Sequence, residues 1–90
     1  MKDAQRKVRE FHKAFGLTIG EYPALRDVAL RRRLIAEEAK EIDDALAAGD
    51  LEGAVKEAID LIYVVTGSLV SWGVDGEVVM HAVHDSNMSK

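Results

Sequence analysis

The chain has 90 residues, of which 48% are hydrophobic, with one proline, no cysteine and a formal net charge of -4. A chain of this size forms one domain, expected to span residues 1–90, and buries only about 60% of its unfolded surface, so an oligomer is compatible with size alone. The absence of cysteine excludes disulfides and thiolate metal sites, and the acidic balance disfavours general binding to nucleic-acid phosphates.

The sequence shows neither a signal peptide nor a membrane span. The basic N-terminal segment lacks the apolar stretch of a signal peptide, and residues 58–74, the least polar run, fall short of about 20 residues and contain Asp60. We therefore expect a soluble, cytoplasmic protein that binds neither nucleic acid nor a membrane.

The first half of the chain predicts two helices. Apolar residues recur at helical spacing in residues 3–15, and Gly16 is a natural C-terminal stop. Residues 17–21 are typical of a loop. Pro23 suits the first turn of a second, long helix, which we expect from Ala24 to Ala48.

The second half predicts two more helices. Gly49 and Asp50 form a turn, with Asp50 as the N-cap of a third helix that continues to Trp72. Because this connection is short, the second and third helices are expected to be antiparallel neighbours. Asp75 is expected to cap a short fourth helix running from Glu77 to about Asp85. The fold class is therefore all-α, a bundle of four helices per chain.

The third helix carries apolar residues all round its surface. After Lys56 it has no clearly solvated face, and a helix of this kind is normally buried on every side. The few helices of a 90-residue monomer can hardly cover it. We therefore expect a second subunit to share it, in a homodimer or a dimer of dimers.

Carboxylates interrupt the apolar faces of the second and third helices. At about 100° per residue, the apolar stripe of the second helix has its middle close to Glu38, with Glu41 beside it. Glu57 and Asp60 repeat this i, i+3 arrangement on the third helix. Uncompensated carboxylates are costly to bury, so the tight hairpin predicts four acids that converge on metal ions.

All-oxygen ligands favour Mg²⁺, with Mn²⁺ as a second choice, over Zn²⁺ or Cu²⁺. Magnesium usually shares its coordination with phosphates, so a phosphorylated ligand is indicated. The alternative interpretation is that the acids are solvated helix charges, with Glu37 and Glu41 paired to Lys40 or Arg33. Two acidic pairs on apolar faces joined by a tight turn make this alternative the weaker one.

These residues also carry a family resemblance. Glu37-Glu38-x-x-Glu41 followed by Glu57-x-x-Asp60 resembles the motif of the MazG-like, all-α nucleoside triphosphate pyrophosphohydrolases. The segments 11–17, 60–63 and 86–90 resemble the short dUTPase-like and phosphoribosyl-ATP pyrophosphohydrolase-like branches of that superfamily.

The resemblance implies Mg²⁺-dependent hydrolysis of a nucleoside triphosphate to the monophosphate and pyrophosphate, in a house-cleaning or pool-balancing role. Glu38, Glu41, Glu57 and Asp60 would ligate the metal. Glu37 would orient or deprotonate the attacking water. Longer relatives carry a substrate-covering tail that the sequence, ending at Lys90, does not show, so weaker closure over the substrate and lower efficiency are expected.

Four further residues are candidate substrate ligands. Asn87 and Lys90 resemble the substrate-binding pair of the family, and their alternative is a frayed polar terminus. Tyr63 lies one turn beyond Asp60 on nearly the same face. We expect its hydroxyl to contact either a ligand or another carboxylate. His12 is a candidate for contacting the base, against the alternative of a surface histidine on a basic helix.

Other functions stay open. Phosphoribosyl-ATP hydrolysis belongs to the same superfamily, and a non-catalytic module that binds nucleotide or a partner uses the same pocket. The run Arg31-Arg32-Arg33 cannot form one phosphate-binding patch, because consecutive helical residues point about 100° apart. Most of this run is expected to be solvated or to line an interface.

Overall fold

A computed structural model describes all residues, 1–90, and shows four α-helices. They are α1 (Lys2–Phe15), α2 (Val28–Ala47), α3 (Leu51–Ser71) and α4 (Gly76–Met88). The predicted all-α chain of four helices is confirmed.

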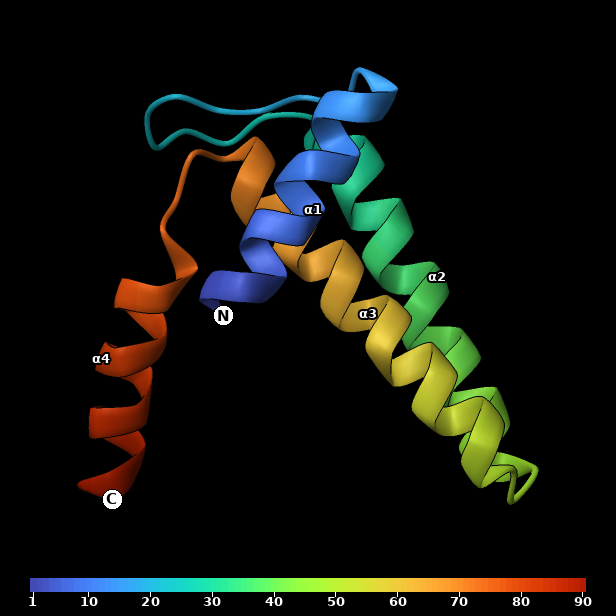
Figure 1. Cartoon of the computed structure of the whole chain (residues 1–90). Coiled ribbons are helices and arrows are strands. Elements are labelled where there is room, and N and C mark those ends of the chain that lie inside the picture. The colour runs from blue at the N-terminus through green and yellow to red at the C-terminus, as the bar shows by residue number, and fades with distance from the viewer.

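The α2–α3 hairpin forms where the sequence places its turn. Gly49 has a φ of 68°, a left-handed conformation that costs glycine no side-chain clash. The Asp50 carboxylate then accepts a hydrogen bond from the Gly53 amide at 2.9 Å and so caps α3. The two helices lie side by side and antiparallel, as predicted (Figure 1).

The predicted start of the second helix was wrong, because α2 begins at Val28 and not at Ala24. The Gly20 amide donates to the Val70 carbonyl and the Ala24 amide to the Trp72 carbonyl, both at 3.0 Å. The last carbonyls of a helix have no partner within it, so these bonds satisfy the end of α3. They hold the segment before α2 out of helical conformation, and the proline lies in this loop.

The predicted end of the fourth helix was also too early. The helix continues beyond Asp85 through Asn87 to Met88. The Ser89 hydroxyl donates to the Asp85 carbonyl at 3.0 Å and satisfies one of the carbonyls that the helix end leaves free. Asp75 caps the start of this helix as predicted, through the Glu77 amide at 3.0 Å.

The helices form an open V rather than a closed bundle (Figure 1). α1 packs against α3, and the α2–α3 hairpin forms one arm. α4 forms the other arm, at 116° to α3, and its main contact is with α1. No single helix is long and apolar enough to cross a membrane. Only α3 and α4 taken together, as this bent pair, have the length and composition of a membrane span.

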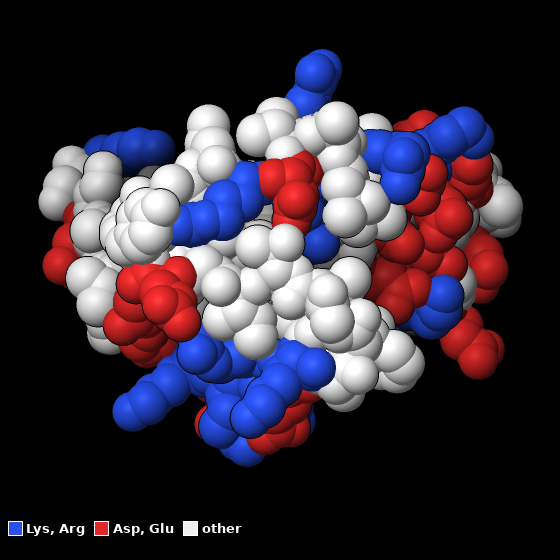
Figure 2. Space-filling model, turned by 90° about the horizontal axis from the view of Figure 1, so that it is seen from above, with Lys and Arg blue, Asp and Glu red and all other residues white.

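The buried centre of the single chain is mostly polar. Its buried apolar side chains are Val8, Ala54 and Val70, whereas the buried polar ones are His12, Arg31, Thr66, Ser68 and Ser71. Many large apolar side chains on α3 and α4 are exposed. The face seen from above in Figure 2 carries separate acidic and basic patches with uncharged surface between them. Packing within one chain therefore leaves many of its large apolar side chains exposed.

Arg31 is the principal polar link between α2 and α3. Its Nε donates to Ser68 Oγ at 2.9 Å and its Nη2 to the Val64 carbonyl at 2.6 Å. Burial lowers the pKa of its guanidinium, and Asp27 partly offsets this. An alanine Cβ at position 67 would lie 2.7 Å from Arg31 Nη2 and 2.9 Å from His12 Nε2, so Gly67 lets both side chains approach α3 closely.

Candidate metal centre

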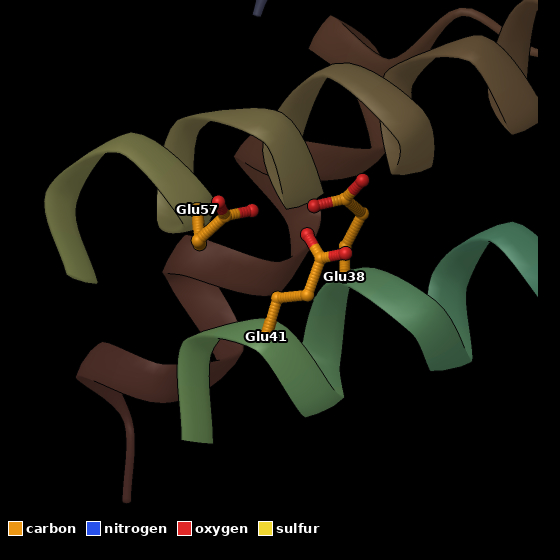
Figure 3. A group of neighbouring side chains, drawn as sticks. All are labelled: Glu38, Glu41 and Glu57. Carbon is orange, nitrogen blue, oxygen red and sulfur yellow. The ribbon is translucent and has the colours of Figure 1, made fainter. Parts of the chain in front are cut away.

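Three carboxylates meet in the groove between α2 and α3. Glu38 and Glu41 are one turn apart on α2, and Glu57 faces them from α3 (Figure 3). One oxygen of each lies within 4.8 Å of the other two. The turn at residues 48–50 sets the register of the hairpin, and this register brings Glu57 level with the two acids of α2.

Two oxygens of this cluster are buried without a partner. Glu38 Oε2 and Glu57 Oε2 are inaccessible to solvent and make no hydrogen bond, whereas Glu41 is exposed. A carboxylate oxygen that has lost its water and gained no hydrogen-bond partner destabilises the charged form of the group. The metal-free cluster is therefore an unfavourable arrangement that a bound cation or proton would relieve.

The closeness of these carboxylates shifts their pKa values. Burial, followed by hydrogen bonding with Glu57 and the charges of Glu41 and Asp60, raises the pKa of Glu38 to about 7 from an ordinary value of 4.5. Glu57 raises the pKa of Glu41 as well. The pKa of Glu57 is lowered, chiefly because Glu41 hydrogen-bonds to its carboxylate. The coupled carboxylates of Glu38, Glu41 and Glu57 therefore bind a proton more readily, as a group, than isolated carboxylates do.

Asp60 borders the cluster but is not one of its three converging members. Its carboxylate lies 2.6 Å from the Lys56 ammonium, which also lies 3.3 Å from Glu57. The pKa of Lys56 is raised, mainly by hydrogen bonding to Asp60. The sequence reasoning missed Lys56 as a neighbour of the site, although its i, i+4 spacing to Asp60 is a visible signal.

Glu37 lies outside the cluster. Its carboxylate is 3.9 Å from the Arg33 guanidinium, and 58% of its side chain is exposed. This is the loose helix-surface pairing that the alternative interpretation proposed for Glu37, while Lys40 pairs with Asp44 at 2.8 Å. The structure thus separates Glu37 from Glu38 and Glu41, which point into the groove (Figure 3).

The four candidate substrate ligands are not assembled at the cluster. Asn87 and Lys90 are exposed at the far end of α4, on the other arm of the V (Figure 1). The Tyr63 ring packs edge-on against Phe11, with ring centroids 5.6 Å apart.

His12 is a core residue. Only 2% of it is exposed, and its Nδ1–H donates to the Thr18 carbonyl at 2.9 Å, so the surface-histidine alternative was wrong. It contacts α3 near Gly67, about 15 Å along the helix from Glu57 at 1.5 Å per residue. The Arg31 side chain is buried likewise, whereas Arg32 and Arg33 are exposed as expected.

The chemistry of the cluster fits a hard divalent cation. All of its donors are carboxylate oxygens, the preferred ligands of Mg²⁺ and Mn²⁺. One oxygen of each carboxylate lies within 4.8 Å of the other two, so the three can surround one cation, and Glu38 and Glu57 each have a buried oxygen without a partner. Glu38, Glu41 and Glu57 are therefore suited to hold a metal.

A family model described as phosphoribosyl-ATP pyrophosphohydrolase matches residues 8–87. The chain belongs to this family. The family lies within the MazG-like, all-α superfamily of nucleoside triphosphate pyrophosphohydrolases, in agreement with the resemblance and with the helical fold. No curated protein matches the chain significantly.

Membership of the family defines the reaction class. The chain is a pyrophosphohydrolase that acts on a nucleotide, and members of the family typically depend on a divalent metal. The matched range contains both helices of the α2–α3 hairpin and therefore all three converging carboxylates.

Proposed function

We propose that the chain is a Mg²⁺-dependent pyrophosphohydrolase that converts a nucleoside or deoxynucleoside triphosphate to the monophosphate and pyrophosphate, and that Mn²⁺ can replace Mg²⁺. The observation that carries this proposal is that the carboxylates of Glu38 and Glu57, each with one buried and unpartnered oxygen, lie on the facing sides of the hairpin (Figure 3). A house-cleaning role in the nucleotide pool follows from the superfamily.

Glu38, Glu41 and Glu57 would hold the metal. Asp60 would become a further ligand by giving up its ion pair with Lys56 and turning toward the metal. When bound, the metal supplies positive charge for the phosphates and increases the acidity of a nearby water. The exchange would leave the Lys56 ammonium, which also lies 3.3 Å from Glu57, beside the carboxylates, where it could contact a phosphate. Lys56 is 67% exposed, so little stands in the way of this movement.

We assign Glu37 to orient the attacking water or to accept its proton. It lies on α2 beside Glu38 but outside the converging cluster, so its carboxylate is free of the metal-binding task. Its contact with Arg33 is long, at 3.9 Å, and 58% of its side chain is exposed, so the carboxylate is accessible to water. A carboxylate within hydrogen-bond reach of the water is the geometric requirement for this role.

Asn87, Lys90 and Tyr63 are proposed as substrate ligands, with the Lys90 ammonium on a phosphate and the Asn87 amide on the sugar or base. We assign no substrate contact to His12, because its ring is buried and already donates to Thr18. His12 instead anchors the loop after α1.

A second candidate substrate is phosphoribosyl-ATP. The description of the matching family model favours it, and it carries the same α–β phosphoanhydride as a nucleoside triphosphate. The same carboxylates would act on either substrate, so the cluster does not discriminate between them. A third alternative is a module that binds nucleotide without turnover.

One assay separates these three functions. The purified protein would be incubated with Mg²⁺ or Mn²⁺ and with single nucleotides: the common ribo- and deoxynucleoside triphosphates, modified ones and phosphoribosyl-ATP. Pyrophosphate release from a triphosphate supports the main proposal, and release from phosphoribosyl-ATP alone supports the second. Nucleotide binding without any pyrophosphate would overturn both and leave the binding module.

We also propose that the working enzyme is a homo-oligomer, either a dimer or a dimer of dimers. The support is the exposure of α3, since Val55, Ile59 and Ile62 are each more than half exposed although they lie on the most apolar helix. An exposed apolar face of this length is typical of an interaction surface.

A further inference from the structure

The guanidinium of Arg31 is buried without a counter-ion. Only 4% of the residue is exposed, and none of the ion pairs of the chain includes it. The two oxygens that it contacts, Ser68 Oγ and the Val64 carbonyl, are uncharged. A buried charge is normally paired, because removing it from water is costly. Arg31 is therefore a cation that a bound anion would stabilise.

The third nitrogen of this guanidinium faces open space. Nη1 donates to no protein atom, since the hydrogen bonds of Arg31 use Nε and Nη2. The buried side-chain atoms without a partner are oxygens of Glu38 and Glu57, so Nη1, which also has no partner, is accessible to solvent. Arg31 lines a cavity of about 190 Å³ between the start of α2 and the loop after α1. The free edge of the guanidinium is thus available to a molecule in this cavity.

The first turn of α2 brings further donors to the same place. The first intrahelical bond at this end is made by the Arg31 amide, to the Asp27 carbonyl, so the amides of Val28, Ala29 and Leu30 have no backbone partner. Asp27 stands at the N-cap position but its side chain caps none of them. Free amides at the start of a 20-residue helix carry partial positive charge and favour an anion. Leu30 and Arg31 both line the cavity, which places it at this end of the helix.

Thr18 lies on the loop side of the cavity. Its carbonyl accepts hydrogen bonds from His12 Nδ1 at 2.9 Å and from the Ser71 hydroxyl at 3.0 Å, which fix the loop against the buried ends of α1 and α3. Its own hydroxyl makes no hydrogen bond within the chain and can donate to a ligand. The cavity is smaller than the roughly 300 Å³ at which sites for drug-sized ligands begin, so it suits a small ion and not a whole nucleotide.

Asp27 opposes anion binding and limits its strength. Its carboxylate lines the cavity, and its charge acts on Arg31 without forming an ion pair. The residue is exposed and has a left-handed backbone conformation, with φ at 53°. An exposed carboxylate can turn toward solvent when an anion enters, although its charge continues to repel the ion. The affinity of the site should therefore rise when this one charge is removed.

We propose that this cavity binds inorganic phosphate, held by Arg31 Nη1, the Thr18 hydroxyl and the free amides of the first turn of α2. The site is distinct from the carboxylate cluster, because Arg31 precedes Glu38 by about 10 Å along the helix at 1.5 Å per residue. Bound phosphate would compensate the buried charge that links α2 to α3, and so stabilise the hairpin. The proposal does not depend on the function proposed above.

Phosphate binding is tested on the metal-free protein in EDTA, where the clustered carboxylates repel anions. Inorganic phosphate would be titrated at constant ionic strength, with sodium chloride as the balancing salt, and followed by ¹⁵N NMR. The amides of Val28, Ala29 and Leu30 should shift along one saturable curve, and the unfolding temperature should rise with phosphate concentration. No saturable shift at these amides, or shifts spread over exposed lysines alone, would overturn the proposal.

Asp27→Asn tests the location of the site by increasing the affinity. It should tighten phosphate binding by about fivefold or more, because it removes a like charge beside the ion. Asparagine adopts the left-handed conformation readily, so the variant should fold normally. Asp43→Asn is the matched control: it removes the same charge from the exposed face of α2, about 24 Å along the helix, and should leave the affinity unchanged. Equal tightening in both variants would show only a response to net charge and overturn the site.

Two further variants remove a donor each. Arg31→Gln should lose saturable binding, since it removes the charge and the free Nη1. If this variant does not fold, Thr18→Val decides, because it leaves the carbonyl of residue 18 in place. It should weaken phosphate binding by about fivefold, the effect of losing one hydrogen bond. Wild-type affinity in Thr18→Val, or in a folded Arg31→Gln, would contradict the proposed contacts and overturn the site.

Discussion

The carboxylate of Glu38 lies in an environment that disfavours its charge. Burial and the neighbouring acids raise its pKa to about 7, and one of its oxygens has no hydrogen-bond partner. Enzyme sites commonly contain groups perturbed in this way, because charge that is unfavourable in the free protein becomes favourable once a ligand compensates it. The residue is thus unfavourable for the stability of the metal-free protein and useful for metal binding.

Replacing this carboxylate should separate stability from activity. We expect Glu38→Gln to lower pyrophosphate release by at least about 100-fold, the upper range for loss of groups that merely support a metal ligand. Thermal unfolding of the metal-free variant at pH 8 should occur at a higher temperature than that of the wild type, because a buried charge and its repulsions are removed.

The matched control is Asp43→Asn, which removes one exposed negative charge from the same helix. It should change neither activity nor the unfolding temperature appreciably. Full activity in Glu38→Gln would show that Glu38 is not a metal ligand.

The pH dependence of stability follows from the same residue. Between its ordinary pKa of 4.5 and its folded pKa of about 7, Glu38 binds a proton in the folded state but not in the unfolded state. Stability therefore falls as the pH rises through this window, because the unfolded state binds fewer protons. The lowered pKa of Glu57 acts in the opposite sense, at lower pH.

Urea denaturation of the metal-free protein in EDTA at pH 5 and pH 8 measures this dependence. The wild type should be less stable at pH 8, and Glu38→Gln should lose most of the difference. Saturating Mg²⁺ should reverse the order for the wild type, because the metal binds the deprotonated acids. Equal stability at both pH values in EDTA would contradict the raised pKa.

At the scale of the elements, the hairpin is held together by polar as well as apolar contacts. Arg31 bridges α2 to α3 through Ser68 and the Val64 carbonyl, and it lies about two turns before Glu38 on the same helix. The register of the two helices at the carboxylates therefore depends on the turn at one end and on this buried guanidinium at the other.

Arg31→Ala should destabilise the fold by about 3 kcal/mol, since each hydrogen bond from a charged group contributes about 1.5–3 kcal/mol. Arg32→Ala is the matched control on the same helix, because Arg32 is exposed and makes no ion pair, and it should stay within about 0.5 kcal/mol of the wild type. Equal unfolding free energies for the two variants, measured by urea denaturation, would show that the Arg31 link is not needed.

At the scale of the whole molecule, one chain lacks a hydrophobic core of ordinary size. Only Val8, Ala54 and Val70 are buried among its apolar side chains. The interior is mainly a polar network around Arg31 and His12, which orients the helices but removes little apolar surface from water. Association, as proposed above, would bury the exposed apolar side chains of α3 and α4.

The folded chain should therefore become more stable as its concentration rises. For a dimer, each tenfold increase in concentration adds about 1.4 kcal/mol to the apparent unfolding free energy. Ile62→Glu should abolish this dependence and give a monomer in light scattering, because it places a charge among the exposed apolar side chains of α3. Val78→Glu, on the face of α4 opposite Val79, Met80 and Val83, which line an apolar cavity with α3, is the control and should keep the dependence.

The sequence by itself determined the helices, the hairpin and the identity of the acids. Apolar spacing, the turn at Gly49 and the cap at Asp50 act within a few residues of the chain, so they can be read without knowing the fold. The same holds for the i, i+3 spacing that puts Glu38 and Glu41 on one side of α2. These local properties suffice to predict an acidic cluster in a helical hairpin.

Only the tertiary structure decided which acids converge and which groups are buried. The rotation of α3 about its axis brings Glu57 to the acids of α2. Asp60 instead forms an ion pair with Lys56, which competes with the cluster. Hydrogen bonds from the preceding loop to the end of α3 make α2 begin only at Val28, and the packing of α1 against α3 buries His12. Each of these results depends on contacts between segments far apart in the chain, for which helical periodicity carries no information.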